Sequence, residues 1–320
     1  MTLVRIVKDW DFPDLIRQTP GGSGLWEGIR YTLDAVDRCD YLIVLNNRMR
    51  SETRVRCPRE HVWALMQEPY QPGFTDWMVE GHQPFSRIFT HCPLPNDRRY
   101  AVSHPAIPWH IDKTYDELVR LKVPEKARAV SWVVGNALDL PGHFKRMSFL
   151  QKLRKREDLP VDLFGRAVRP VADKFEALAP YRFSLAVENS SSPDYWTEKL
   201  ADCFLTYTVP LYYGCTNIHH YFPEASIVAI DIRRPAEAFD IIERTLQQDE
   251  WEQRLPALRE ARRRVLERYQ LMAHLGGLIR RYGDPAASEE TVVVPPYRRS
   301  ASTSVRRIGY KMRRRLRIGF

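Results

Sequence analysis

The sequence predicts an α/β protein built from two Rossmann-like domains that face a cleft. Short apolar segments typical of buried strands recur along the chain, and helical segments separate them. The length of 320 residues corresponds to about two ordinary domains. Hydrophobic residues make up 44% and charged residues 28% of the chain, which are ordinary globular values and exclude a mainly disordered protein.

The first 110 residues or so predict one α/β unit. Its strands are expected at 3–7, 41–45, 62–66 and 86–90, and a mixed helical pattern covers 25–38. Between Cys92 and His110 the chain is rich in proline and polar residues, which indicates a loop that leaves this unit.

The residues that follow predict a second α/β unit. Thr114 and Glu117 have the spacing of a capping box and open a short helix. Strands are expected at 129–134, 161–164, 183–187, 209–213 and 227–230, and helices at 142–155, 195–206 and twice within 235–281. The expected domains are therefore 1–112 and 113–285, followed by a linker and basic tail at 286–320.

Cysteine usage and targeting signals favour a cytoplasmic protein. The five cysteines are odd in number, widely spaced and lack a C-x-x-C pair, which favours a reducing compartment. The apolar start of the chain is too short and too charged for a signal peptide. The spacing of Cys203, Cys215, His219 and His220 matches no common structural zinc site, and we expect no metal there.

The segment richest in polar chemistry leads from a strand through a loop of small residues into a helix. Glu188 and Asn189 leave the strand at its carboxyl edge, where open α/β sheets bind ligands. The next helix offers free backbone N–H groups to a phosphate, Lys199 adds a charge, and Glu198 can accept hydrogen bonds from ribose hydroxyls. This pattern predicts a cradle for a nucleoside diphosphate. In the alternative interpretation, Asp194 simply caps the helix and the two charged residues are solvated.

The residues between Phe183 and Gly214 carry a specific pattern. It reads F-x-x-x-x-E-N-S, then D-Y-x-T-E-K, then V-P-L-Y-Y-G, and it closely resembles the donor-binding signature of the α1,3/4-fucosyltransferases. The resemblance covers about residues 128–285, with Gly135 where the family often has serine before Asn136. The first 110 residues resemble the family only loosely, which leaves the acceptor undetermined.

The resemblance implies a GT-B fold and transfer of fucose from GDP-fucose to a sugar hydroxyl with inversion at the anomeric carbon. It implies that Arg146 and Lys199 bind the diphosphate, with help from Arg182. The other donor-binding positions that it implies are Glu188, Asn189 and Ser190 beside the sugar, and Tyr195, Thr197 and Glu198 at the ribose and neighbouring groups.

Inversion in one displacement needs a base for the acceptor and stabilisation of the departing diphosphate. Because this leaving group is already anionic, Arg, Lys and a helix N-terminus can replace a divalent metal, and we expect no obligatory cofactor. The one D-x-D sequence, Asp9-Trp10-Asp11, is interpreted as turn and capping chemistry because it lies far from the donor signature.

Glu68 is the predicted base. It follows the strand at 62–66 and precedes a proline, and the family places its proposed base after a comparable strand. The alternative is a loop carboxylate that caps a turn. The rival bases in the same region are His82, His91, His104 and His110.

The tail concentrates positive charge. From Arg298 to Phe320 it holds nine of the 49 basic residues and none of the 40 acidic ones, which leaves 40 of each sign in the rest of the chain. Its apolar residues form one helical stripe, as in helices that lie on anionic bilayers. The residues expected to contact the membrane are Arg306, Arg307, Lys311, Arg313, Arg314, Arg315 and Arg317. A disordered solubilising tail is the alternative, and no nucleic-acid recognition motif accompanies the basic run.

The sequence thus predicts a metal-independent, inverting fucosyltransferase that uses O3 of N-acetylglucosamine or glucose in a bacterial surface polysaccharide, lipopolysaccharide or lipid-linked glycan. It is expected to associate peripherally with the inner face of the membrane. One alternative keeps the fold and uses another GDP-sugar. The other is a non-enzymatic protein that binds polyanions through its tail.

Overall fold

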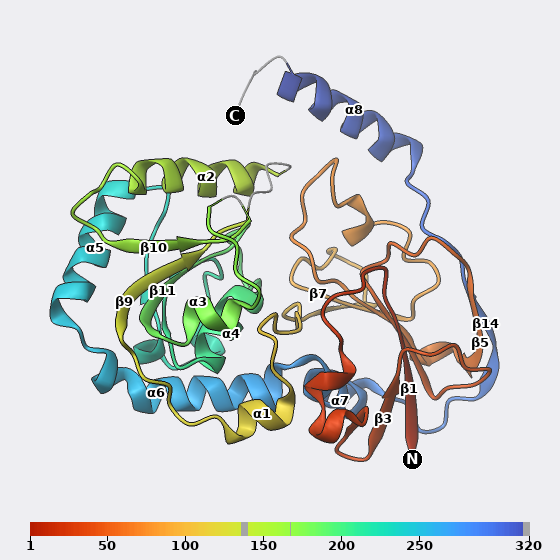
Figure 1. The fold of residues 1–320 in the computed structure, drawn as a ribbon. Coiled ribbons are helices and arrows are strands. Elements are labelled where there is room, and N and C mark those ends of the chain that lie inside the picture. The colour runs from red at the N-terminus through yellow and green to blue at the C-terminus, as the bar shows by residue number, and fades with distance from the viewer. Residues whose placement is uncertain (136–139, 167, 316–320) are drawn as a thin grey trace. The chain divides into compact units, whose positions relative to one another are not determined.

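The computed structural model describes residues 1–135, 140–166 and 168–315, and the chain divides into two compact units (Figure 1). Unit 1 comprises Met1–Ala106 and Leu271–Phe320, and unit 2 comprises Ile107–Gln270. The division after Ala106 lies close to the expected boundary at 112. The second division differs, because residues 271–285 were expected in the second domain and the tail was expected to be separate.

The C-terminal segment returns to unit 1 for a physical reason. Helix α7 (Leu271–Tyr282) receives a hydrogen bond of 2.9 Å from the Tyr31 hydroxyl to the Met272 carbonyl. Strand β14 (Glu289–Val294) pairs antiparallel with β5 (Thr53–Pro58) along its whole length. Val292 and Val294 of this strand are buried in the core of unit 1. These contacts replace the expected linker with an integral part of the first domain.

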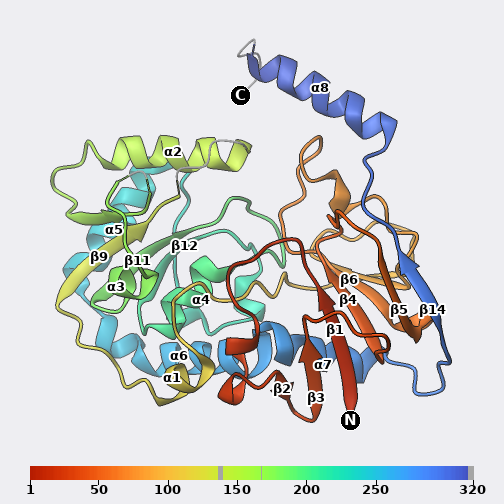
Figure 2. The same cartoon turned by 45° about the vertical axis from the view of Figure 1, so that its right-hand side comes forward.

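Unit 1 contains a seven-stranded sheet of order β2-β3-β1-β4-β6-β7-β8, in which only β2 is antiparallel to its neighbour. Figure 2 labels β1, β2, β3, β4 and β6 of this sheet. Its strands are β1 (Thr2–Val7), β2 (Leu25–Trp26), β3 (Ile29–Thr32), β4 (Tyr41–Leu45), β6 (Val62–Leu65), β7 (Arg87–Thr90) and β8 (Tyr100–Val102). The four strands expected in this unit are confirmed.

The helical segment expected at 25–38 is wrong. Residues 25–26 and 29–32 form β2 and β3 instead, joined by a tight turn. Gly28 in that turn has a φ of +79°, which a helix does not permit, and Ile29 and Tyr31 alternate with exposed residues in the manner of a strand.

Unit 2 contains a five-stranded parallel sheet of order β10-β9-β11-β12-β13. Its strands are β9 (Arg128–Val133), β10 (Val161–Phe164), β11 (Tyr181–Val187), β12 (Val209–Tyr213) and β13 (Val228–Ala229). All five lie where the sequence predicts them. Parallel pairing with intervening helices agrees with a Rossmann-like unit.

The helices of unit 2 are α1 (Tyr115–Arg120), α2 (Pro141–Leu153), α3 (Lys174–Leu178), α4 (Glu198–Leu205), α5 (Pro235–Gln248) and α6 (Trp251–Arg264), followed by a π-helical turn at Val265–Tyr269. The capping box of Thr114 and Glu117 is confirmed. Phe149 of α2 lies between Trp132 of β9 and Phe239 of α5, which joins two helices to the sheet. Single 3-10 turns occur at Ile16–Gln18, Pro20–Gly22, Arg59–His61, Asp76–Met78, Ile218–His220 and Glu224–Ser226.

Strand order in unit 2 identifies the edge where a ligand binds. The chain runs from β9 outward to β10 and then returns to β11, β12 and β13 on the other side, so the order reverses between β9 and β11. In open parallel sheets, ligands bind outside the carboxyl ends of the strands at such a reversal. The residues that follow Val187 of β11 therefore occupy the expected position.

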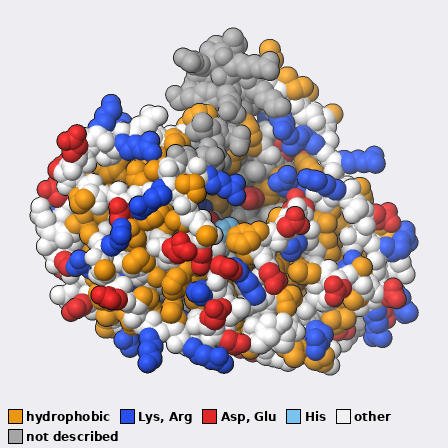
Figure 3. Space-filling view, viewed as in Figure 1, with side chains coloured by type: hydrophobic (Ala, Val, Ile, Leu, Met, Phe, Trp, Pro, Cys, Tyr) orange, Lys and Arg blue, Asp and Glu red, His pale blue; other side chains and the backbone are white. Residues whose placement is uncertain are grey.

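The surface charges of the folded units are mixed in sign. On the face drawn in Figure 3, Lys and Arg side chains are interspersed with Asp and Glu side chains. This agrees with the equal numbers of acidic and basic residues outside the tail. No helix among the described residues is long and apolar enough to cross a membrane.

Candidate active site

A buried carboxylate, that of Glu188, joins the carboxyl end of β11 to the start of α4. Its Oε1 accepts hydrogen bonds from the backbone N–H and the hydroxyl of Thr197, at 2.8 and 2.9 Å. Its Oε2 lies 3.2 Å from Lys199 Nζ. The residue is only 1% exposed. Burial raises the pKa of Glu188, and the charge of Lys199 opposes that shift.

The first turn of α4 supplies the cation and the helix N-terminus that the sequence predicts. Thr197 is the N-cap, and its hydroxyl accepts from the backbone N–H of Lys199. Lys199 Nζ lies between two carboxylates, 3.2 Å from Glu188 and 3.4 Å from Glu198. Burial alone would lower the pKa of Lys199, but these carboxylates raise it above its ordinary value, so the lysine carries its charge at neutral pH.

A second cation, Arg146 of α2, reaches the same loop. Its Nη1 donates to Asn189 Oδ1 at 2.5 Å, and its Nη2 donates to the Gly135 carbonyl at 3.3 Å. Its buried Nε finds no hydrogen-bond partner within the part of the chain that the structure describes. Gly142 brings α2 this close, because a Cβ there would stand 1.7 Å from the Asn189 carbonyl oxygen. Arg146 is thus fixed beside Asn189 with donor capacity to spare.

The glycine that ends the V-P-L-Y-Y-G motif has a steric role at the same point. A Cβ on Gly214 would stand 2.5 Å from Glu188 Cγ and 2.5 Å from the Tyr212 hydroxyl. That hydroxyl accepts a hydrogen bond of 2.9 Å from the Cys215 backbone N–H. Any larger residue at 214 would therefore displace the carboxylate on which the cluster is built.

The structure brings together most of the residues that the sequence predicts at the donor site. Those that contact one another directly are Arg146, Glu188, Asn189, Thr197, Glu198 and Lys199. Ser190 follows Asn189 and is half-buried, and Tyr195 is buried in the loop before α4. Asn136 lies outside the described residues.

Arg182 does not join this cluster. It is the second residue of β11, six positions before Glu188, and a strand advances about 3.3 Å per residue. It therefore lies near the opposite end of the sheet, where its guanidinium pairs with Asp249. The resemblance aligned Arg182 by its place in the sequence, whereas the direction of the strand carries it away from the cluster around Glu188.

The candidate bases of unit 1 occupy different environments. Glu68 follows β6 and is exposed between the buried residues Gln67 and Pro69. Both ring nitrogens of His82 are within hydrogen-bond distance of protein groups, and burial lowers its pKa to about 4. The Nδ1 atom of His104 accepts a hydrogen bond from the backbone N–H of Ala106, and its Nε2 atom lies 3.1 Å from Nδ1 of His274. His82 and His104 therefore serve the fold, and His110 belongs to unit 2.

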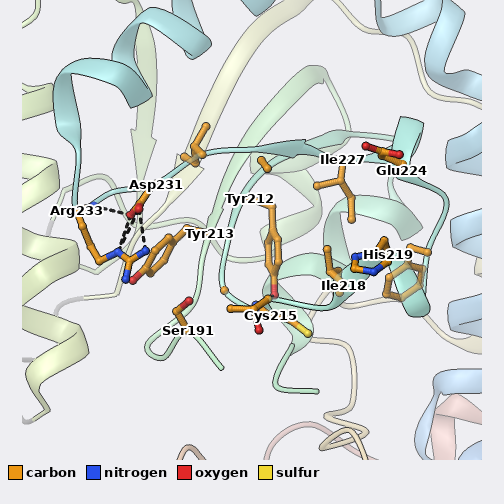
Figure 4. A pocket seen from close by; sticks show the side chains of 15 residues that line it. Ser191, Tyr212, Tyr213, Cys215, Ile218, His219, Glu224, Ile227, Asp231 and Arg233 are labelled. Carbon is orange, nitrogen blue, oxygen red and sulfur yellow. Dashed lines mark hydrogen bonds and ion pairs between the residues drawn. The ribbon is translucent and has the colours of Figure 1, made fainter. Parts of the chain in front are cut away.

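A cavity of about 680 Å³ lies at the carboxyl ends of β12 and β13 in unit 2 (Figure 4). Ser191, from the loop between β11 and α4, lines this cavity together with Tyr212 and Tyr213. On one side Arg233 forms hydrogen bonds of 2.8 to 3.1 Å with Asp231, and Figure 4 shows this pair beside Tyr213. The cavity therefore lies beside the loop between β11 and α4, outside the carboxyl ends of the strands, where open parallel sheets bind ligands.

Three further polar residues adjoin Glu198 and were not predicted there. They are Lys174 of α3, Asp202 of α4, and His110, which the sequence indicates only as a rival base. Glu198 and Asp202 stand four residues apart, the spacing that places two side chains on one helix face. This spacing was the one signal in the sequence that could have placed Asp202 near Glu198. The contacts of Lys174 and His110 could not be predicted, since they join segments that are distant in the sequence.

Within residues 1–135, 140–166 and 168–315, no group of three or more His, Cys, Asp or Glu side chains is arranged to hold a metal ion. Cys203 is buried inside α4, and the Cys215 sulfur lies 3.0 Å from Asn217 Oδ1. In the D-x-D segment, Asp9 pairs with Arg48 at 3.5 Å.

Comparison with known proteins identifies relatives of the region that carries the cluster. Residues 123–252 match the family profile described as glycosyltransferase family 10 (fucosyltransferase) C-term. A GDP-fucose protein O-fucosyltransferase 3 from Danio rerio is 33% identical over 36% of this chain and 25% of its own length. A 4-galactosyl-N-acetylglucosaminide 3-alpha-L-fucosyltransferase 9 from Bos taurus is 34% identical over 36% of this chain and 33% of its own. The chain spans a quarter to a third of these relatives, and the resemblance seen in the sequence is confirmed.

Solved structures support the fold. An α1,3-fucosyltransferase matches with a TM-score of 0.50 and 18% identity over 80% of each chain. An α-glucosyltransferase in complex with UDP and DNA matches with a TM-score of 0.50 and 8% identity over 88% of this chain and all of its own. At these identities the likeness concerns the fold alone, and it confirms the expected GT-B type of α/β protein.

Replacing Thr197 tests whether the junction between β11 and α4 stabilises unit 2. Thr197→Val removes the N-cap and one partner of a buried carboxylate, and should lower the free energy of unfolding by about 2–4 kcal/mol. Thr197→Ser keeps the hydroxyl and should cost less than about 1 kcal/mol. Urea unfolding followed by circular dichroism measures both variants. Equal stability of the valine and serine variants would contradict the proposed role of the hydroxyl.

Proposed function

Because residues 123–252 belong to glycosyltransferase family 10 (fucosyltransferase), we propose that this protein transfers L-fucose from GDP-fucose to a glycan hydroxyl with inversion. The acceptor position that we propose is O3 of N-acetylglucosamine or glucose in a surface glycan. The name of the zebrafish relative includes GDP-fucose, and the bovine relative is named as a 3-alpha-L-fucosyltransferase. Both names support the choice of donor sugar for this chain.

The observation that carries the proposal is the cluster at the carboxyl end of β11. Arg146, Lys199 and the N-terminus of α4 converge there on one loop. Two cations and a helix N-terminus are the groups that stabilise a diphosphate, both when the donor binds and when GDP departs. Glu198 in the same helical turn offers a carboxylate to the ribose hydroxyls. A diphosphate-linked sugar therefore suits this site better than a substrate without phosphate.

The reaction that we propose is a single displacement. The base removes the proton from the acceptor hydroxyl, whose oxygen attacks the anomeric carbon of fucose from the side opposite the leaving group. The bond between that carbon and the GDP oxygen breaks, and Arg146 and Lys199 neutralise the released diphosphate. Glu68 is the proposed base, since it is an exposed carboxylate that follows a buried strand of unit 1.

The tail helix supports a proposal on location. Glu80 accepts hydrogen bonds from Tyr297, Ser300 and Thr303 at 2.5, 2.8 and 3.0 Å, which holds the start of α8 (Ala301–Arg315) on unit 1. The apolar residues Val305, Ile308 and Met312 are 69%, 58% and 59% exposed. An apolar stripe among arginines suits an anionic bilayer, and we place the enzyme on the inner face of a membrane.

Two of the proposed membrane contacts, Arg306 and Arg307, have side chains that the structure describes; Arg306 is exposed and Arg307 is half-buried. Arg317 lies outside the described residues. The side chains of Lys311, Arg313, Arg314 and Arg315 are not described either.

Thermal unfolding in the presence of sugar nucleotides tests the donor. A ligand that binds only the folded state raises the melting temperature according to its concentration and affinity. We expect GDP-fucose to raise it, GDP-mannose to raise it less, and UDP-glucose to leave it unchanged. Lys199→Ala should weaken GDP binding at least about tenfold, because it removes a charged contact to phosphate. Stabilisation by UDP-glucose alone would exclude the proposed donor.

Replacing Glu68 tests the base. Glu68→Gln keeps the shape of the side chain but cannot take a proton, so we expect GDP binding to be retained and kcat to fall by about 10² or more. Glu60→Gln is the matched control, since Glu60 is an exposed glutamate just before the same strand. Release of GDP in the presence of acceptor measures turnover. Full turnover by Glu68→Gln would remove this residue as the base.

Flotation on liposomes tests the tail. A chain that ends at Tyr297 should no longer float with anionic vesicles, whereas the full chain should float with them and not with neutral vesicles. A full-length variant with serine at 305, 308 and 312 keeps every charge and isolates the contribution of the apolar stripe. Unchanged flotation of the truncated chain would refute membrane binding through α8.

A further inference from the structure

The carboxylate of Glu198 lies among three basic side chains that come from three separate segments of unit 2. Its Oε1 is 3.4 Å from Lys199 Nζ, 3.6 Å from Lys174 Nζ and 3.8 Å from His110 Nδ1. Its side chain is mostly buried. A buried carboxylate needs a charged partner to remain ionised, and this one has two lysines at similar distances.

The two lysines are held differently. Lys199 Nζ is shared among Glu188, Thr197 and Glu198, at 3.2, 3.1 and 3.4 Å. An ammonium group has three N–H donors, so this lysine can approach a diphosphate only by giving up at least one of these contacts. The contact to Glu198 is the longest of the three. Loss of that contact on donor binding would leave Glu198 dependent on its other neighbours.

Lys174 is the neighbour that is fixed in place. Its ammonium group lies 3.2 Å from Asp202 Oδ2, and the other oxygen of Asp202 accepts from the His110 backbone N–H at 2.9 Å. Asp202 is 1% exposed and lies on the same face of α4 as Glu198. Lys174 therefore lies between two carboxylates four residues apart, at the start of α3. The position of the Lys174 ammonium group does not depend on the conformation of the Lys199 side chain.

We propose that Lys174, held by Asp202, is a positioning residue that acts as the standing counter-ion of Glu198 and so frees Lys199 to bind the donor diphosphate. The proposal rests on the proposed function, in which Lys199 binds phosphate and Glu198 binds the ribose. It adds residues that the fucosyltransferase signature does not contain. In this role Lys174 acts through its contacts with Glu198 and Asp202.

The charges that face Glu198 come from every element packed around it. The cationic groups are Lys174 from α3, Lys199 from α4 and Arg146 from α2. The anionic groups are Glu188, which directly follows β11, and Asp202 from α4. Burial lowers the pKa of His110, so its imidazole is neutral near pH 7. Burial alone would raise the pKa of Glu198, but Lys199, His110 and Lys174 hold it well below its ordinary value.

The direction of the pH effect follows from these groups. Glu198 accepts hydrogen bonds from hydroxyls in its ionised form, so donor affinity falls once the pH drops below its pKa. Removing the charge of Lys174 raises that pKa. The variant should therefore lose GDP affinity at a higher pH than the unmodified protein as the solution becomes more acidic.

The experiment compares Lys174→Met with Lys174→Arg in the full chain. Calorimetric titration with GDP from about pH 8 down to the lowest pH at which the protein stays folded should show that Lys174→Met raises Kd by about tenfold, the factor that corresponds to one pKa unit of coupling. The acid limb of the affinity profile should move to higher pH, and kcat at saturating GDP-fucose should change less than KM. Lys174→Arg keeps the charge and should restore both quantities. Lys152→Met, an exposed lysine of α2, is the control and should change neither.

The outcomes separate this inference from the proposed function. If the unmodified protein binds GDP while Lys174→Met keeps its Kd and its pH profile, the counter-ion role is overturned and the proposed function stands. If the unmodified protein binds no GDP, the proposed function fails. Carbon-13 NMR of the Glu198 carboxyl, assigned with Glu198→Gln, then tests Lys174 without a ligand, and an unshifted titration in the variant overturns its role. If Lys174→Met does not fold, Lys174→Gln replaces it in both measurements.

Discussion

The donor site depends on one buried ion pair, that of Glu188 with Lys199. A carboxylate with 1% exposure at the end of a parallel strand is destabilising unless charged and hydrogen-bonding groups surround it. Its partners are the N-cap and the second residue of α4, so the strand, the following loop and the helix must assume one arrangement together. Gly214 leaves the space in which the carboxylate lies. The same contacts that stabilise this junction place the helix N-terminus where we propose that a phosphate binds.

The ion pair also sets the charge that a donor meets. Lys199 is neutralised by carboxylates before any ligand arrives, and Arg146 is engaged by Asn189. A diphosphate therefore has to compete with protein oxygens for these cations, which favours a ligand with high charge density over a singly charged one. The excess positive charge of the chain belongs to the tail, since the remaining residues carry 40 basic and 40 acidic side chains. The basic character of the chain and its nucleotide site are separate features.

Most of the donor cluster was predictable because it is local in sequence. Residues from Glu188 to Lys199 form one strand–loop–helix segment, and their types and spacing already indicate phosphate chemistry. Contacts between distant segments could not be predicted in the same way. The pairing of β14 with β5 joins residues more than 230 positions apart in the sequence. The contact between Lys174 and Asp202 joins residues that are 28 positions apart. The separation of Arg182 from the cluster was not predictable for a related reason, since a position in a motif does not tell which end of a strand a residue occupies.

We propose that residues 188–199, at the carboxyl end of β11 and the start of α4, hold the GDP part of the donor. Hydrogen–deuterium exchange of the full chain, followed by mass spectrometry with and without saturating GDP, measures this directly. Bound GDP should slow exchange of the backbone amides in peptides that cover 188–199, because these N–H groups donate hydrogen bonds to the diphosphate and lose access to water. Unchanged exchange in these peptides, together with slower exchange elsewhere in the chain, would contradict the claim.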